Sequence, residues 1–86
     1  MYYVYLLKSI DHEFIYIGST NDLKNRLLEH NNGKNQSTKF YAPFKLIYYE
    51  AYVNKDDALT REYKLKHHGS VKGHLKKRLT KSLSKG

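Results

Sequence analysis

The chain has 86 residues, a formal net charge of +8, nine tyrosines and no cysteine. This length suits one compact domain and is too short for two. The lack of cysteine excludes disulfides and thiolate metal sites, and it is typical of a reducing compartment. No apolar run approaches the roughly 20 residues that a membrane helix needs, and the first residues leave no room for a signal peptide. We therefore expect a cytoplasmic protein that does not contact a membrane.

The positive charge is concentrated toward the C-terminus. Residues 1–63 contain equal numbers of acidic and basic side chains, whereas residues 64–86 contain eight Lys or Arg and no Asp or Glu. A block of one sign is typical of a protein that binds a polyanion, most commonly nucleic acid. The alternative is a solvated segment that only improves solubility. Five of these side chains are predicted to contact nucleic acid: Lys66, Lys72, Lys76, Lys77 and Arg78.

Three segments have the aromatic and β-branched composition of strands. Residues 2–7 are apolar on both faces and predict a central strand. Residues 14–18 predict its hairpin partner after a loop of about five residues, and residues 44–52 predict a third strand. Because alternate side chains of a strand share a face, Tyr16 and Gly18 should point away from the neighbouring isoleucines.

Helices are predicted between and after these strands. Residues 22–31 predict the first helix, with a leucine stripe and N-cap candidates at 19–21. A second helix should begin at Asn54 and end near His68, and residues 71–81 predict a short basic helix. Residues 82–86 are expected to be disordered. This order of elements predicts an α+β fold, in which helices pack on a small, mainly antiparallel sheet.

Glu62 fits a purely structural account least well. The stripe expected to face inward on the second helix comprises Ala58, Leu59, Tyr63 and Leu65 or Lys66. Glu62 falls within or at the edge of that stripe, and carboxylates rarely occupy an apolar face without a partner or a metal. The alternative is a carboxylate at the rim of the helix that pairs with Lys66, one turn further on.

Arg26 and His30 lie four residues apart, beside the leucine stripe of the first helix. Both can have ordinary roles, since an Arg in such a place usually extends into solvent and a lone His is more often structural than catalytic. Arg is nevertheless the side chain best suited to hold a phosphate, and His can transfer a proton near neutral pH. With one carboxylate and exposed tyrosines, they are the groups needed for metal-assisted phosphodiester hydrolysis.

Two further segments are candidates for contact with nucleic acid. Residues 31–43 predict a polar loop of a length that is often functional, and its Lys34 and Lys39 are expected to contact the substrate. Gly18 ends a strand, where a glycine either lets the chain turn or marks a close approach by a backbone or ligand. We include Gly18 and the adjacent Ser19 among the predicted nucleic-acid contacts.

Other chemistries lack residues at the required spacing. His67, His68 and His74 have no carboxylate or thiolate nearby, so a structural zinc site is not expected. The glycines near residue 70 do not have the spacing of a phosphate-binding P-loop. No Ser-His-Asp arrangement can be read from the sequence, and catalysis would therefore use a metal-bound water or a tyrosinate.

The ordered residues resemble the GIY-YIG nuclease superfamily. Tyr3-Val4-Tyr5 and Tyr16-Ile17-Gly18 look like its paired signature. Arg26, His30 and Glu62 follow where the family has its helix arginine, a histidine one turn later and its metal-binding glutamate.

The resemblance covers residues 2–68 and is greatest to the small stand-alone bacterial members. Residues 69–86 are then a basic C-terminal helix and tail, partly disordered. Two positions depart from the family pattern. Tyr3 stands at the first glycine of the signature, and Ser19 stands where the repair excinuclease branch has a lysine.

The resemblance implies a three-stranded antiparallel sheet flanked by helices, with the active site on one face. Tyr5 and Tyr16 would lie near the scissile phosphate, with Tyr16 as the general base and Tyr5 orienting it, although family members differ on which tyrosine leads. Glu62 would hold a single Mg²⁺ or Mn²⁺ ion. Arg26 would neutralise charge in the transition state, and His30 would assist proton transfer or bind phosphate.

The predicted function is a metal-dependent endonuclease acting on DNA as a monomer, in repair or recombination. Because no second targeting domain can be read from the sequence, structure-directed cleavage or low sequence specificity is expected. The alternative is a non-catalytic nucleic-acid-binding module on the same scaffold. Such a degenerate relative would be expected to lose Glu62 or Arg26 first, since neither is needed for packing.

Overall fold

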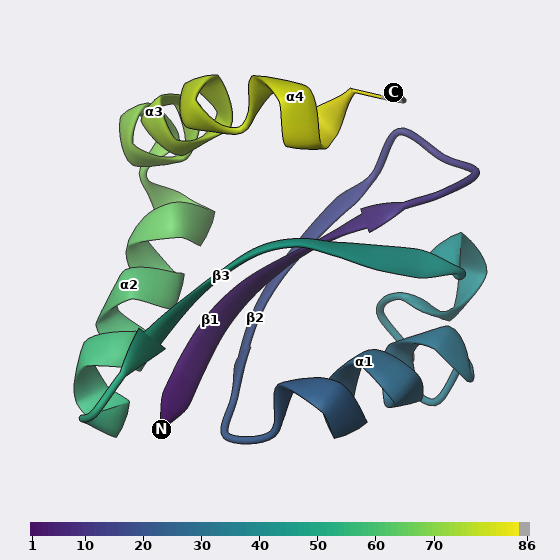
Figure 1. Ribbon diagram of the computed structural model, residues 1–86, viewed down its shortest axis with the longest axis horizontal. Helices are drawn as coiled ribbons and strands as arrows, with labels where there is room; N and C mark the ends of the chain where they lie inside the picture. The colour runs from purple at the N-terminus through teal and green to yellow at the C-terminus, as the bar shows by residue number, and fades with distance from the viewer. Residues whose placement is uncertain (85–86) are drawn as a thin grey trace.

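The protein forms a three-stranded sheet with helices on both faces (Figure 1). In the computed structural model, which describes residues 1–84, the strands are β1 (Tyr2–Ser9), β2 (Ile15–Thr20) and β3 (Phe44–Tyr52). Their order is β2-β1-β3, and both pairs are antiparallel. The predicted α+β fold is confirmed, with the doubly apolar first strand at the centre of the sheet.

Four α-helices and one short 3₁₀ helix complete the described chain. They are α1 (Leu23–Asn31), the 3₁₀ helix (Lys39–Tyr41), α2 (Lys55–His67), α3 (Gly69–Arg78) and α4 (Thr80–Leu83). Helix α4 lies where the sequence predicts disorder from residue 82; the last part of that prediction, residues 85–86, lies outside the described residues. None of the helices in residues 1–84 has the length and apolar character needed to cross a membrane.

Two side-chain caps define where the main helices begin. The Asp22 carboxylate accepts a hydrogen bond from Asn25 N at 3.1 Å, so the N-cap of α1 is Asp22 rather than one of the residues 19–21. This capping bond satisfies one of the amides that the first turn leaves unpaired. At the start of α2, Asn54 accepts from Asp56 N at 2.8 Å, as its sequence position predicts.

The sheet separates two apolar clusters, one on each face. On one face, β1 contributes Val4 and Leu6 to a cluster under α2 and α3. The other buried members of that cluster are Ile17, Ala58, Leu65 and Leu75. On the opposite face, Tyr5 and Leu7 pack with Phe44 and with the leucines of α1. Tyr16 belongs to this second cluster, so the predicted separation of Tyr16 from the isoleucines of β2 is confirmed.

The inward face of α2 is narrower than the sequence pattern predicts. Ala58 and Leu65 are buried, but Leu59 and Tyr63 are 43% and 59% exposed, so the prediction that they face inward is wrong. The reason is that two adjacent charged residues, Arg61 and Glu62, lie on either side of the line from Ala58 to Leu65. Helix α2 therefore packs on the sheet along one row of small and leucine side chains.

Arg61 and Glu62 connect α2 to opposite edges of the sheet. The Arg61 guanidinium donates two hydrogen bonds to the Glu50 carboxylate on β3, at 2.9 and 3.0 Å. The hydroxyls of Tyr48 and Tyr52 also donate to Glu50. Glu62 instead accepts a hydrogen bond from Ser19 on β2. These polar contacts fix the position of the helix across the sheet and leave Glu62 at the β2 edge.

The Glu50 cluster makes folding stability depend on pH. Burial acts to raise the pKa of Glu50, but the hydrogen bonds from Arg61 and the two tyrosines outweigh it and hold the pKa below the ordinary 4.5. A carboxyl with a lowered folded-state pKa contributes stability above its unfolded pKa. That contribution is lost as the pH falls through the folded-state value.

We predict that Glu50→Gln lowers the free energy of unfolding by about 1–3 kcal/mol at pH 7, because it removes charge-assisted hydrogen bonds from a half-buried Arg61. The difference from wild type should shrink as the pH falls below about 4. Urea denaturation at several pH values measures both effects. Asp11→Asn, an exposed acid in the β1–β2 turn, should change stability little at any pH. Equal stability of Glu50→Gln and wild type at pH 7 would contradict the assigned role.

Candidate active site

Tyr5 of β1 lies at the centre of the candidate site and packs over Gly18 of β2. Tyr5 and Gly18 are direct partners in the antiparallel register. A Cβ atom built on Gly18 would lie 2.5 Å from the Tyr5 hydroxyl oxygen, 2.6 Å from its Cζ and 2.8 Å from Cε2 of Tyr16. Only glycine leaves room for this arrangement. Of the two predicted roles for Gly18, close approach therefore applies, but to the protein's own tyrosines. Because these rings cover it, the geometry does not favour its predicted contact with nucleic acid.

A buried hydrogen-bonded chain begins at the Tyr5 hydroxyl. It lies 3.0 Å from Nε2 of His30, and Nδ1 of His30 lies 2.8 Å from the Thr38 hydroxyl. All three residues are at most 1% exposed. His30 therefore cannot contact a phosphate directly, and its burial favours the other predicted role, proton transfer through Tyr5. Sequence reasoning missed Thr38, which lies in a polar loop and whose burial no local pattern signals.

The environment of this chain sets the protonation of its members. Burial raises the pKa of Tyr5 to about 12, with the charge of Tyr16 acting in the same direction and Arg26 opposing it. Burial also lowers the pKa of His30 below 6.5, and the nearby Arg26 charge adds to this effect. At neutral pH, Tyr5 is therefore protonated and His30 is neutral. The pair can relay a proton without holding a buried charge.

Tyr16 is the more accessible of the two signature tyrosines. Its ring centroid lies 4.9 Å from that of His30 and 6.2 Å from that of Tyr5. Tyr16 is half-buried, whereas Tyr5 is 1% exposed. The Lys66 ammonium lies 5.8 Å from the centroid of the Tyr16 ring. Of the two hydroxyls, that of Tyr16 is the one placed to meet a substrate.

Glu62 lies beside Tyr16 at the β2 edge. Its Oε1 accepts a hydrogen bond from the Ser19 hydroxyl at 2.7 Å, and its Oε2 lies 2.8 Å from the Lys66 ammonium. The side chain is 18% exposed. Pairing with Lys66, the alternative role raised from the sequence, is thus present, and the carboxylate is also held against strand β2 by Ser19.

These groups are compatible with a divalent ion at Glu62. Mg²⁺ takes oxygen ligands and usually keeps several waters, needing only one or two carboxylates and a substrate phosphate. The carboxylate of Glu62 and the hydroxyl of Ser19 supply oxygen, and a metal ion bound there would take the place of the Lys66 ammonium beside the carboxylate. Within residues 1–84, no group of three or more His, Cys, Asp or Glu could form a metal site built from protein alone. A metal ion would therefore depend on water and phosphate for its remaining ligands.

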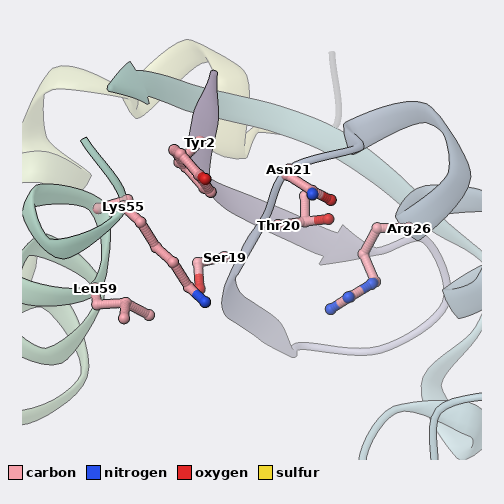
Figure 2. A pocket seen from close by; sticks show the side chains of 8 residues that line it. Tyr2, Ser19, Thr20, Asn21, Arg26, Lys55 and Leu59 are labelled. Carbon is pink, nitrogen blue, oxygen red and sulfur yellow. The ribbon is translucent and has the colours of Figure 1, made fainter. Parts of the chain in front are cut away.

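Arg26 approaches the site from α1. It lines a cleft of about 230 Å³ together with Ser19 and Thr20 of β2 and Lys55 and Leu59 of α2 (Figure 2). Its Nε donates to Glu29 at 3.1 Å. The guanidinium also faces the Tyr5 hydroxyl, and a phosphate oxygen is a further partner that suits its paired N–H donors.

The predicted basic contacts fall into separate groups. Lys66 belongs to the site itself, and Lys34 lines a small pocket with Arg26, Glu29 and Asn35. The Lys39 ammonium lies 5.1 Å from the centroid of the exposed Phe40 ring, in the loop before β3.

The basic residues of α3 lie over two different parts of the sheet. Lys72 and Lys76 line a cleft with Lys8 and the β1–β2 hairpin, on the β2 side. Burial raises the pKa of Tyr48, and the charge of Arg78 opposes this effect, which places Arg78 near β3. Lys77 is exposed. The basic segment is therefore not a uniform surface around the site.

Comparison with known proteins shows the family to which this fold belongs. A family model described as the GIY-YIG catalytic domain matches residues 1–77, which include most of α3. A UPF0213 protein of Clostridium perfringens is 46% identical over 67 residues, 77% of this chain and 71% of that protein. A UPF0213 protein of Staphylococcus epidermidis is 41% identical over 66 residues, 76% of this chain and 79% of that protein.

A solved structure has the same fold. The solution NMR structure of a UPF0213 protein from Bacillus halodurans superposes with a TM-score of 0.55 and 30% sequence identity, covering 91% of this chain and 85% of that one. The chain belongs to the GIY-YIG family of nuclease domains. The relatives compared here are small UPF0213 proteins, whose names state no activity.

The packing of Tyr5 over Gly18 can be tested by adding one methyl group. Gly18→Ala should lower the free energy of unfolding by about 1–3 kcal/mol, because the new Cβ overlaps the Tyr5 ring. Gly73→Ala is the matched control. Nothing lies within 4 Å of its added Cβ, and alanine favours the helix by about 0.5–1 kcal/mol. Chemical denaturation of both variants measures the difference, and a Gly18→Ala protein as stable as Gly73→Ala would refute the contact.

Proposed function

We propose that this protein is an endonuclease that hydrolyses phosphodiester bonds of DNA with one Mg²⁺ or Mn²⁺ ion bound at Glu62. One observation carries the proposal. The Tyr5 hydroxyl lies 3.0 Å from Nε2 of His30, and the Tyr5 ring centroid lies 6.2 Å from that of Tyr16. The Lys66 ammonium lies 5.8 Å from the Tyr16 centroid and 2.8 Å from the Glu62 carboxylate. A candidate base and a candidate metal ligand thus lie next to one buried hydrogen-bonded chain, and Arg26, a side chain suited to phosphate, lines the cleft at the same strand β2.

Each side chain has a distinct role in the proposed reaction. When bound at Glu62, the metal ion would polarise the scissile phosphate and stabilise its developing negative charge. The guanidinium of Arg26, held at Nε by Glu29, would bind a phosphate oxygen and neutralise further charge. Ser19 fixes the rotamer of Glu62 through its 2.7 Å hydrogen bond.

We assign to Tyr16 the role of accepting the proton of the attacking water. Tyr16 would hold the water and accept its proton as the general base, because its side chain reaches solvent beside Glu62 and Lys66. Tyr5 retains its own proton, since burial raises its pKa to about 12. Its hydroxyl would orient the neighbouring tyrosine and exchange protons with neutral His30.

The mode of substrate binding follows from the charges. Lys and Arg side chains on α2 and α3 would contact the phosphate backbone, which gives affinity without reading bases. We therefore propose cleavage directed by nucleic-acid structure rather than by a long recognition sequence, as in DNA repair or recombination. A second candidate, a non-catalytic binding module, is favoured by one observation: both oxygens of Glu62 already have protein partners.

A nicking assay separates the two candidates. Supercoiled plasmid and branched DNA are incubated with wild type, Glu62→Gln and Asp57→Asn in Mg²⁺, Mn²⁺ or EDTA. We expect metal-dependent nicking by wild type and a loss of about 100-fold or more in Glu62→Gln, since a ligand to the stabilising charge is removed. Asp57 is an exposed acid in the first turn of the same helix, and its variant should remain active. Equal cleavage by wild type and Glu62→Gln would reject the metal site. DNA binding without cleavage by any variant would establish the binding module instead.

The salt dependence of binding tests where the DNA phosphate backbone lies on the protein. Each phosphate contact contributes about 0.9 to the slope of log affinity against log salt on duplex DNA. The double variant Lys72→Met/Lys76→Met should therefore reduce the slope by up to about 1.8, because both residues line the cleft beside the start of β2, the strand that also carries Tyr16 and Ser19. Lys77→Met/Arg78→Met removes the same charge and should reduce it less, since Arg78 lies near β3. Fluorescence anisotropy in EDTA provides the affinities. Equal slopes for the two double variants would contradict the proposal that the DNA backbone runs along the β2 side of the protein.

A further inference from the structure

An exposed aromatic surface lies on α2 next to the proposed metal ligand. Tyr63 directly follows Glu62 and is 59% exposed, and Leu59, one turn earlier, is 43% exposed. Single exposed apolar side chains are common on protein surfaces. Here, however, the two form a continuous pair at i and i+4, and the amphipathic pattern of the helix predicts both to be buried. Side chains that break the local pattern are concentrated at functional sites.

This pair adjoins the site geometrically. Successive residues of an α-helix are about 100° apart, so Lys66 and Leu59 lie between Glu62 and Tyr63 around the helix axis. Lys66 binds Glu62 at 2.8 Å. Leu59 lines the cleft that also contains Ser19 and Arg26, and Figure 2 shows its side chain facing that space with Lys55. The surface of Leu59 and Tyr63 therefore continues the cleft outward across α2.

Neighbouring rings hold Tyr63 in place. The His67 ring centroid lies 4.4 Å from that of Tyr63 at an interplanar angle of 37°, and His68 lies 6.1 Å away at 62°. A supported aromatic side chain loses little conformational freedom when a ligand stacks on it. The same turn of α2 carries Lys64 and Lys66, so positive charge flanks the aromatic surface.

We propose that Tyr63, together with Leu59, stacks on an unpaired nucleobase of a nucleic acid whose backbone lies in the active site. An aromatic side chain flanked by positive charge is the combination that binds single-stranded nucleic acid. Bases inside an intact duplex are covered by their neighbours and cannot reach this ring. The surface thus selects substrates with a single-stranded or flapped nucleotide beside the cleaved phosphate. This inference rests on the proposed function and specifies its substrate class.

The test compares binding to a flapped and an intact duplex that carry 2-aminopurine, in the flap or within the duplex. All variants are made in the Glu62→Gln background, so that the DNA is not cut. Tyr63→Ala should weaken binding to the flapped duplex about tenfold or more, the usual effect of removing one base-stacking aromatic. It should also abolish the stacking-induced fluorescence quenching and leave affinity for the intact duplex within about twofold. Tyr63→Phe keeps the ring and should behave as the parent.

Tyr49→Ala is the matched control, because Tyr49 is a similarly exposed tyrosine, at 53%, on the β3 edge of the sheet. It should not change binding to either duplex. Unchanged flap binding by Tyr63→Ala would overturn the proposal, and so would an equal loss on both duplexes. A dimer in light scattering that Tyr63→Ala dissociates would also overturn it, because the surface would then bind a second copy of the chain.

The outcome can be separated from that of the proposed function. If wild type fails to cut DNA but the Tyr63-dependent quenching is present, hydrolysis is rejected and base stacking stands. If wild type cuts DNA and Tyr63→Ala in the inactive background binds the flapped duplex as its parent does, base stacking is rejected and the nuclease stands. Circular dichroism of each variant confirms that the fold is intact, as expected for changes at an exposed position.

Discussion

The contact between Tyr5 and Gly18 sets the geometry of both the sheet face and the site. The side chain of the central strand lies across the edge strand, where any Cβ would collide with it. Its hydroxyl thereby reaches His30 of α1, which in turn reaches Thr38 of the following loop. One buried chain of polar groups thus connects β1, α1 and the loop. Tyr5 and His30 have matching polar partners, so their burial leaves no side-chain hydrogen-bonding atom unpaired among the described residues.

A second constraint acts from the other face of the sheet. Helix α2 packs through Ala58 and Leu65, and its adjacent charged residues bind opposite edge strands. Arg61 is neutralised by Glu50, whose carboxylate also accepts hydrogen bonds from Tyr48 and Tyr52, which makes this half of the arrangement structural. Glu62 is left at the opposite edge with a serine and a lysine, where solvent and substrate can approach. The structural residue Arg61 and the proposed metal ligand Glu62 thus point to opposite edges of the sheet, because neighbouring residues of a helix lie about 100° apart around its axis.

The sequence determined much of this arrangement without any structure. The doubly apolar segment at the N-terminus predicted the central strand, and strand alternation placed Tyr16 and Gly18 on the correct face. The order of the signature tyrosines, Arg26 and Glu62 identified the family. These features depend on local periodicity or on an ordered motif, and both can be read directly from the chain.

Other features depend on tertiary contacts that have no local signal. Thr38 is buried because a loop folds over His30, although its neighbours in sequence are polar. Leu59 and Tyr63 are exposed because α2 packs along a narrow row, which periodicity alone does not reveal. The burial of His30 likewise favours one of its two predicted roles, since a fully covered imidazole can relay a proton but cannot touch a phosphate directly. Long-range packing, rather than propensity, settles each of these cases.

The proposed function depends most on Glu62 as the carboxylate that would hold the metal ion. Anomalous diffraction from crystals soaked in Mn²⁺ with a nonhydrolysable oligonucleotide measures this directly. The account predicts one strong anomalous peak in contact with the Glu62 carboxylate and a substrate phosphate, between Ser19 and Tyr16. The peak should be absent in crystals of Glu62→Gln. A peak that persists in that variant, or one bound elsewhere on the chain with none at Glu62, would contradict the proposed active site.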